Sequence, residues 1–286
     1  MGAFHIVAGT GRMGTTYIAD FLNRISGVMA MHEGHLGHDA GPDLLPMVNL
    51  KQLAAYKSDA EAIVVVNELR SPEIIELAIG KHSADILIDV AYYNSVLAPY
   101  LLSAFPNMRL TAIVRDCESF VRSATWLKGT DPMPVGWPDP QKPLDARERF
   151  IAMGRLRPII GDASEQWSNW SAIQRNIWLW RETNYLLLSA VERYRDRALL
   201  IDFSSFTSDT DQTMRKIMQW IDCQKYEKLL STCSWPSSLT DDSSQNPRRG
   251  GYQIGPAIEW TTNEQDQLEI AEVAVQEKVE ALGGYD

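Results

Sequence analysis

Short apolar runs alternate with helical patterns along most of the chain. Runs that are apolar on both faces and rich in branched side chains are typical of strands in a buried parallel sheet, and they occupy residues 63–66, 86–88, 110–114 and 199–201. Helical patterns cover about 72–80, 94–104, 116–127, 209–222 and 263–281, and the expected N-caps of the last two are Asp209 and either Thr262 or Asn263. This order predicts an α/β fold with right-handed crossovers and a central parallel sheet flanked by helices.

A further strand begins at Phe4 and leads into a glycine-rich turn over residues 9–14. The apolar side chains that follow the turn share one helical face, with Gly27 as the expected stop: Tyr17, Ile18, Phe21, Leu22 and Ile25. The first N–H groups of a helix have no partner within the helix, and the helix dipole adds positive charge there. We therefore expect the turn to bind a phosphorylated ligand.

This turn satisfies more than one known pattern. Gly9, Gly11 and Gly14 form G-x-G-x-x-G, and Glu33 lies about 20 residues further on, as in proteins that bind a nicotinamide dinucleotide. The turn also has the spacing of a nucleoside-triphosphate loop, but Thr15 stands where that loop has Lys. An oxidoreductase thus remains an alternative, whereas an ATPase or a kinase is disfavoured.

The third pattern is a basic residue, a flexible residue, Gly, Thr and Thr, present as residues 12–16. It resembles the 5′-phosphosulfate loop of sulfotransferases that use 3′-phosphoadenosine 5′-phosphosulfate (PAPS). A second segment of that family is a strand that ends in Arg, followed eight residues later by Ser, and Arg115 and Ser123 match it. A third is a basic-basic-Gly segment, matched by Arg248, Arg249 and Gly250. The three motifs stand in the family's order and span nearly the whole chain.

The resemblance implies a P-loop-like three-layer sandwich and a donor site made by residues of all three motifs. It implies that Arg12 contacts the phosphosulfate and that the loop residues Gly11, Met13, Gly14, Thr15 and Thr16 hold the 5′-phosphate. Arg115, Ser123, Arg248, Arg249 and Gly250 would hold the 3′-phosphate. Tyr17 either stacks on the adenine, as an aromatic residue does in some members, or belongs to the core.

Sulfuryl transfer needs a base for the acceptor's proton and positive charge at the leaving oxygen. Arg12 is the expected source of that charge. One branch of the family places its base, a His, after a later strand, where this chain has Asp89. Other branches have a Glu shortly after the first helix, as Glu33 stands here. Glu33 is therefore our first choice for the base and Asp89 the second.

Three histidines beside Glu33 suggest a metal site as an alternative, namely His32, His35 and His38. The H-E-x-x-H motif fails because position 36 is Leu, and a shared helical face would need a helix across Gly34 and Gly37. We expect no metal. These histidines either assist proton transfer or contact the acceptor, or their role is wholly structural.

Composition and charge restrict the possible partners. The chain has 286 residues and a formal net charge of −10, which argues against nucleic acid as a partner because duplex binding needs a broad basic face. No run of about 18 apolar residues and no basic-then-apolar leader occurs, so we expect a cytoplasmic protein without membrane insertion. The three cysteines show no paired C-x-x-C spacing, so we expect reduced thiols: Cys117, Cys223 and Cys233. We expect one domain over 1–286, and the oligomeric state stays open.

A proline-rich stretch interrupts the regular pattern. Five of the 14 prolines lie between Gly129 and Pro143, which predicts a substrate loop or lid at about 129–165. Acidic side chains and tryptophans near this stretch favour a small cationic or polycyclic acceptor, for instance a cationic secondary metabolite, over a polyanionic glycan: Asp131, Asp139, Glu165, Trp167, Trp170, Trp178 and Trp180. A lipid or a phenol stays open as the acceptor. The sequence thus predicts a sulfotransferase that moves a sulfuryl group from PAPS to a hydroxyl or amine, leaving adenosine 3′,5′-bisphosphate (PAP). The alternatives are an NAD(P)-dependent oxidoreductase and a non-catalytic nucleotide-binding protein.

Overall fold

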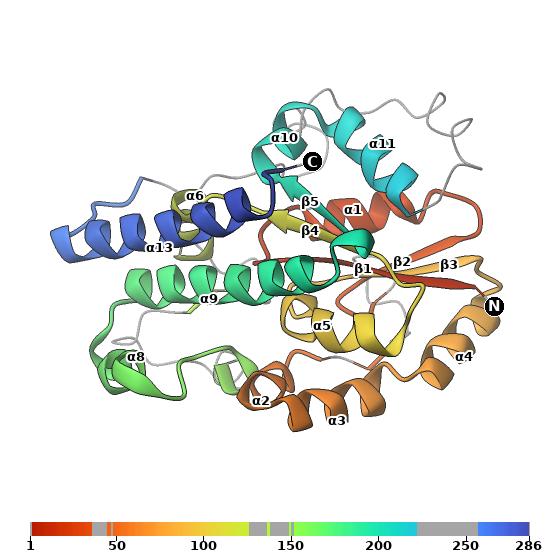
Figure 1. The fold of residues 1–286 in the computed structure, drawn as a ribbon, viewed down its shortest axis with the longest axis horizontal. Helices are drawn as coiled ribbons and strands as arrows, with labels where there is room; N and C mark the ends of the chain where they lie inside the picture. Colours follow the sequence, from red (N-terminus) through yellow and green to blue (C-terminus); the bar gives the residue numbers. More distant parts are fainter. Residues whose placement is uncertain are drawn as a thin grey trace.

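Five parallel strands form one sheet at the centre of the protein (Figure 1). The computed structural model describes residues 2–35, 45–46, 48–125, 136–137, 149, 152–221 and 257–285. The strand order is β2-β3-β1-β4-β5, and the bounds are β1 Ala3–Gly9, β2 Val28–His32, β3 Ile86–Val90, β4 Leu110–Val114 and β5 Ala198–Asp202. The predicted parallel sheet is confirmed, with β1 as its central strand.

Helices cover both faces of the sheet. Those of the described residues are α1 Thr15–Leu22, α2 Gln52–Lys57, α3 Asp59–Leu69, α4 Pro72–His82, α5 Asn94–Ala104, α6 Cys117–Thr125, α8 Gly161–Gln166, α9 Ala172–Arg193, α10 Phe203–Ser208, α11 Thr210–Trp220 and α13 Thr262–Ala281. Figure 1 shows α1, α10 and α11 on one face and α5 and α9 on the other. Alternate residues of β1 pack into the two hydrophobic clusters, Ile6 and Ala8 on the α5 side and Val7 on the α1 side. The result is the predicted α/β three-layer sandwich.

The order of connections reverses between the neighbouring strands β1 and β3: β1 connects to β2 at one edge of the sheet, whereas β3 connects to β4 on the other side of β1. These strands are neighbours, with Val7 opposite Val90 at their carboxyl ends. The helix that follows β1 is α1 on one face, whereas α5, which follows β3, lies on the other face. Loops that leave adjacent strands in opposite directions open a crevice, which is where open α/β sheets bind ligands.

The predicted strand at 63–66 is wrong, because these residues lie within α3. Ser58 caps that helix by accepting a hydrogen bond from the Glu61 N–H, and acidic side chains occupy its first turn. A short apolar run does not by itself distinguish a strand from a helix. The fifth strand is instead β2, whose sequence Val-Met-Ala-Met-His has few branched side chains and was not predicted as a strand.

The sequence predicted where three helices begin or end, and the structure confirms one of these positions and shifts the other two. The α1 helix ends at Leu22, earlier than Gly27, and the next side chain, Asn23, accepts a hydrogen bond of 2.8 Å from the Ala30 N–H on β2. Asp209 caps α11, as predicted. The cap of α13 is Thr261, one residue before the predicted pair, because Glu264 completes a capping box with it.

Two further predictions concern membrane-spanning segments and the cysteines. Among the residues that the structure describes, no helix is long and apolar enough to cross a membrane. Cys117 is buried with a free thiol, and burial raises the pKa of that thiol well above its ordinary value. Cys223 and Cys233 lie outside the described residues.

Candidate active site

The glycine-rich turn joins β1 to α1 at the carboxyl edge of the sheet. Gly14 is the N-cap of α1 with a φ of 77°, a left-handed conformation that favours glycine. A Cβ atom at Gly9 would lie 1.9 Å from the Met13 sulfur and 2.6 Å from the Ile113 carbonyl oxygen. The turn therefore folds tightly back onto β4, with the fully buried Met13 side chain as its anchor. Met13 can reach a ligand with its backbone alone.

Arg12 brings two of the predicted motifs together. Its Nε donates a hydrogen bond of 3.0 Å to the Ser123 hydroxyl on α6. Its carbonyl oxygen accepts a hydrogen bond from Nη1 of Arg115, the residue directly after β4. The glycine-rich turn and the strand-end Arg with its Ser, which are about a hundred residues apart in the chain, thus meet at Arg12.

Arg115 is held rigidly in this position. Only 1% of the residue is exposed, and its guanidinium donates to the Ser119 hydroxyl and to the Ser119 carbonyl oxygen, each at 2.8 Å. The guanidinium carbon lies 5.2 Å from the centre of the Phe203 ring. The Trp180 indole donates to the Arg115 carbonyl oxygen at 2.7 Å. A guanidinium with so many partners keeps its position before any ligand binds.

The segment after β5 forms a wall beside the turn. A Cβ atom at Gly14 would lie 3.2 Å from the Phe206 ring, and the Tyr17 ring meets Phe206 edge-on with centroids 6.1 Å apart. Phe203 stacks on Phe206. Tyr17 is half-buried, so its ring contacts the core on one side and keeps some exposed surface.

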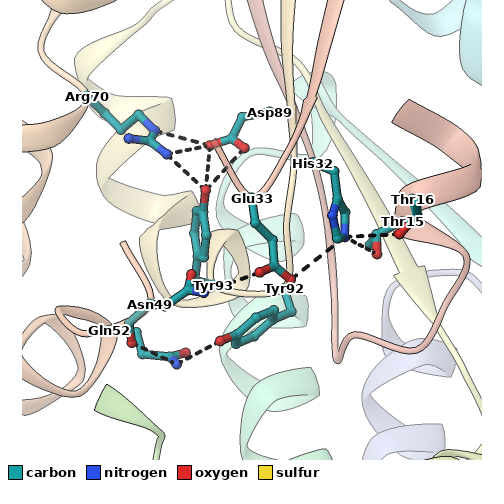
Figure 2. A network of polar contacts seen from close by, with 10 residues as sticks. All are labelled: Thr15, Thr16, His32, Glu33, Asn49, Gln52, Arg70, Asp89, Tyr92 and Tyr93. Carbon is teal, nitrogen blue, oxygen red and sulfur yellow. Dashed lines mark hydrogen bonds and ion pairs between the residues drawn. The ribbon is translucent and has the colours of Figure 1, made fainter. Parts of the chain in front are cut away.

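Glu33 lies on the other side of the turn, connected to it through His32. The Nε2 atom of His32, at the end of β2, is 3.0 Å from the Thr15 hydroxyl and 3.4 Å from the Thr16 hydroxyl. The same atom is 3.8 Å from a carboxylate oxygen of Glu33 (Figure 2). His32 therefore lies between the threonines of the turn and the predicted base.

A second set of contacts reaches Glu33 from the chain around α2. The Asn49 side chain donates to the other Glu33 carboxylate oxygen at 3.2 Å, and Gln52 donates to the Tyr92 hydroxyl at 3.4 Å (Figure 2). Tyr92 is partly buried, and the desolvation of its hydroxyl together with the charge of Glu33 raises the pKa of that hydroxyl. The Glu33 side chain keeps 15% of its surface exposed, so solvent or a ligand can reach it.

Asp89 occupies a different environment (Figure 2). Its side chain is fully buried and pairs with the equally buried Arg70, with Nε and Nη2 of Arg70 each 3.1 Å from the same carboxylate oxygen. Tyr93 donates to Asp89 and accepts from Arg70, and Arg70 also donates to the Pro46 and Leu69 carbonyl oxygens. Burial raises the pKa of the Asp89 carboxyl, against the opposing effect of Arg70. The geometry is that of a structural ion pair.

A small pocket of about 10 Å³, room for about one water molecule, lies at the carboxyl ends of β1 and β3. Its polar lining comes from Thr10 after β1, Gln52 on α2, Tyr92 after β3, Arg155, and Thr183 on α9. Glu33 is connected to this lining because the Asn49 side chain donates to it, while the Asn49 carbonyl oxygen accepts from Gln52 at 3.3 Å. The pocket thus lies beside the predicted base and the glycine-rich turn.

Some predicted residues lie outside the described residues, namely His38, Arg248, Arg249, Gly250 and most of the substrate loop at 129–165. Within the described part of the chain, no group of three or more His, Cys, Asp or Glu side chains is placed to hold a metal ion. His35 pairs with His32 through their backbones, in a short bridge after β2.

Sequence reasoning missed Asn49, which connects Glu33 with the pocket, and three residues of the pocket lining: Gln52, Tyr92 and Arg155. The first two follow a segment without a recognisable pattern. Tyr92 had a usable signal, since it follows a predicted strand and the carboxyl ends of parallel strands share one edge of a sheet. Arg70 was also missed, although a buried carboxylate such as Asp89 needs a cationic or hydrogen-bonding partner.

The fold is that of the sulfotransferases. The structure is similar to a sulfotransferase domain from the curacin biosynthetic pathway, with a TM-score of 0.50 and 11% identity over 94% of this chain and 97% of that domain. It is also similar to the sulfotransferase STF9 from Mycobacterium avium, with a TM-score of 0.50 and 14% identity over 96% of this chain and 76% of that one. No protein-family model matches the sequence, and a comparison with curated protein sequences finds no match. The sulfotransferase fold predicted from the three motifs is confirmed.

Proposed function

We propose that the protein transfers the sulfuryl group of PAPS to a hydroxyl group of a small acceptor. One observation carries the proposal: Arg12 contacts Ser123 and Arg115 on one side of the turn, while the Thr15 hydroxyl contacts His32 beside Glu33 on the other. Groups suited to bind two phosphates and a carboxylate suited to accept a proton therefore surround one short loop.

The donor site would combine the first turn of α1 with the residues that follow β4. The backbone N–H groups of this turn and the hydroxyls of Thr15 and Thr16 would bind the 5′-phosphosulfate. Arg115 and Ser123 would bind the 3′-phosphate, since a rigid guanidinium and a hydroxyl suit that anion. The resemblance adds Arg248, Arg249 and Gly250 to this set and leaves Tyr17 as the candidate for adenine.

The transfer itself needs little covalent chemistry from the protein. The acceptor oxygen attacks the sulfur in line, the bond from sulfur to the bridging oxygen breaks, and PAP leaves with the negative charge on that oxygen. Arg12 would stabilise the developing charge, as would the N–H groups of the turn. The acceptor's proton would pass to Glu33.

The surroundings of the two carboxylates favour Glu33 over Asp89 as the base. Glu33 is partly exposed, next to the pocket and to the turn. Asp89 is fully buried and paired with Arg70. A proton acceptor must come within hydrogen-bond distance of the acceptor hydroxyl, and Asp89 would have to leave its ion pair to do so.

Ligand-induced thermal stabilisation tests the donor. A ligand that binds only the folded protein stabilises it by RT ln(1 + [L]/Kd), so PAP at 100 times its Kd adds about 2.7 kcal/mol. We expect PAP to raise the melting temperature more than NADPH or ATP at equal concentration. Preferential stabilisation by NADPH would favour the oxidoreductase, in which Arg115 and Ser123 have no role. Stabilisation by PAP without any turnover of PAPS would favour a non-catalytic nucleotide-binding protein.

A further inference from the structure

The side chain of His32 lies between the two halves of the proposed site (Figure 2). Its Nε2 atom is 3.0 Å from the Thr15 hydroxyl and 3.4 Å from the Thr16 hydroxyl. A carboxylate oxygen of Glu33 lies 3.8 Å from the same nitrogen, which is close enough for an electrostatic interaction and too far for a hydrogen bond. One ring nitrogen is therefore close both to the threonines proposed to bind the donor and to the proposed base.

The backbone fixes His32 and Glu33 relative to each other. The His32 N–H donates to the His35 carbonyl oxygen at 2.9 Å, and the His35 N–H donates back to the His32 carbonyl oxygen at 3.0 Å. The two residues between them both have positive φ, 54° at Glu33 and 88° at Gly34, as in a type I′ turn. The Glu33 N–H also donates to the Val90 carbonyl oxygen at the end of β3, at 3.3 Å. Both side chains thus project from a tight turn that is tied to the sheet.

Glu33 adopts a backbone conformation that residues other than glycine rarely take. Among the described residues, those that are not glycine and have a positive φ are Arg12, Glu33 and Ser83. Arg12 and Glu33 are the two residues proposed to act on the leaving oxygen and on the acceptor's proton. Disfavoured backbone conformations are concentrated at functional sites, where the surrounding structure holds them. This supports a role in the site for the whole turn after β2, including His32.

The hydrogen-bonding capacity of a threonine hydroxyl decides the direction of its contact with His32. A hydroxyl has one proton to donate and two lone pairs that accept. A phosphate group offers strong acceptor oxygens. When the Thr15 and Thr16 hydroxyls donate to the 5′-phosphate, as proposed, neither has a proton left for His32. The imidazole then keeps its contact with them only as a donor, which requires a proton on Nε2.

We propose that His32 is a positioning residue whose Nε2–H donates to the Thr15 hydroxyl in the donor complex and so directs that hydroxyl at the 5′-phosphate. This inference rests on the proposed function. The same N–H presents its positive end to the Glu33 carboxylate oxygen and favours the ionised form, which is the form that can take the acceptor's proton. His32 itself forms no bond to the donor or the acceptor. It acts through Thr15 on the donor and through Glu33 on the transfer.

Two variants of His32 separate a hydrogen-bond donor from a side chain that only fills space. His32→Gln keeps an N–H donor near the position of Nε2, whereas His32→Leu has no polar group. In calorimetric titration we expect His32→Leu to weaken PAP binding by about threefold to tenfold, the scale of one hydrogen bond. Its kcat should fall as well, and His32→Gln should recover most of both losses. Equal losses in the two variants, or none in either, would contradict the proposal.

The matched control is His82→Leu. His82 ends α4 shortly before β3 begins, so it lies at the opposite edge of the sheet from the site. This variant should leave PAP affinity and kcat near those of the wild type. A loss as large as that of His32→Leu would mean that the effect comes from general destabilisation, and the role of His32 would be wrong.

A double-mutant cycle tests whether His32 acts on the donor through Thr15. Thr15→Val removes the hydroxyl and keeps the branched shape of the side chain. In the Thr15→Val background, His32→Leu should weaken PAP binding by less than about twofold further, because the contact is already lost. Losses that add in full would overturn the proposed path through Thr15.

Nitrogen-15 NMR of the wild-type protein measures the protonation of Nε2 directly, since a ring nitrogen that carries a proton differs in chemical shift from one that does not. The His32 signals are assigned by their loss in His32→Gln. We expect a proton on the His32 Nε2 in the PAP complex, and an unprotonated Nε2 there would overturn the proposal. If PAP does not bind at all, the proposed function fails. If PAP binds and Nε2 is unprotonated, the donor site stands and the role of His32 is wrong.

Discussion

The Nε atom of Arg12 lies 3.0 Å from the hydroxyl oxygen of Ser123, to which it donates a hydrogen bond. The two residues belong to motifs that the resemblance assigns to opposite ends of the donor, the phosphosulfate and the 3′-phosphate. Their contact shows that the fold brings both ends of the proposed donor site to one place. Arg12 would have to exchange this hydroxyl for the phosphosulfate when the donor binds.

The first prediction concerns this exchange. Arg12→Ala should lower kcat more than it weakens binding of PAP, because charge on the leaving oxygen is greatest in the transition state. Ser123→Ala should mainly weaken PAP binding. Steady-state kinetics and calorimetric titration with PAP measure the two effects. A change in KM alone for Arg12→Ala would reduce Arg12 to a binding residue.

The second prediction concerns the 3′-phosphate. Arg115→Ala should weaken binding of PAP much more than binding of adenosine 5′-phosphosulfate, which lacks that phosphate. The variant should also melt at a lower temperature, since Arg115 holds the turn through the Arg12 carbonyl oxygen. Arg122→Ala is the control, because Arg122 pairs with Glu118 on α6, the helix that begins two residues after Arg115. Equal losses for the two nucleotides would contradict the assignment of Arg115.

The third prediction concerns the base. Glu33→Gln keeps the size of the side chain and its hydrogen bond with Asn49 but cannot take a proton, so kcat should fall by about 10² or more. Affinity for PAP should stay near that of the wild type. Glu68→Gln, at an exposed site, is the matched control. If kcat is unchanged for both Glu33→Gln and Asp89→Asn, a histidine is the base or the acceptor arrives already deprotonated.

The fourth prediction concerns the buried pair of Asp89 and Arg70. Asp89→Asn leaves the Arg70 charge uncompensated, which costs about 3–5 kcal/mol of unfolding free energy. For a chain of this size the melting temperature should fall by at least about 6 °C. Asp85→Asn, at an exposed position directly before the same strand, should leave the melting temperature unchanged. A variant Asp89→Asn with full stability but no turnover would make Asp89 the base.

Much of the fold was predictable from the sequence because its strands are short, apolar runs separated by well-capped helices. The runs around Ile88, Ile113 and Leu200 do form strands, and Asp209 does cap its helix. The run at 63–66 failed because its pattern fits a helix as well as a strand, and the cap at Ser58 and its packing against α5 decide for the helix. The strand at Val28–His32 has only one β-branched residue, Val28, and is fixed by pairing with β3.

The part of the candidate site that lies in local sequence motifs was predictable. The glycine-rich turn, Arg115 and Ser123 stand in recognisable patterns, and the structure brings all three together. Their roles toward PAPS remain predictions. The pocket beside them was not predictable, because Gln52, Tyr92 and Arg155 come from separate parts of the chain and carry no shared motif.

Transfer of labelled sulfuryl from PAPS to an acceptor tests the central claim most directly. The purified protein is incubated with PAPS labelled in its sulfuryl group and with a set of small hydroxylated acceptors, charged and neutral, and the products are separated and counted. Our account predicts that the label moves to the acceptor, with one PAP formed for each sulfated molecule, and that Glu33→Gln slows this transfer by about 10². Label that stays on PAPS with every acceptor offered, charged or neutral, would contradict the account.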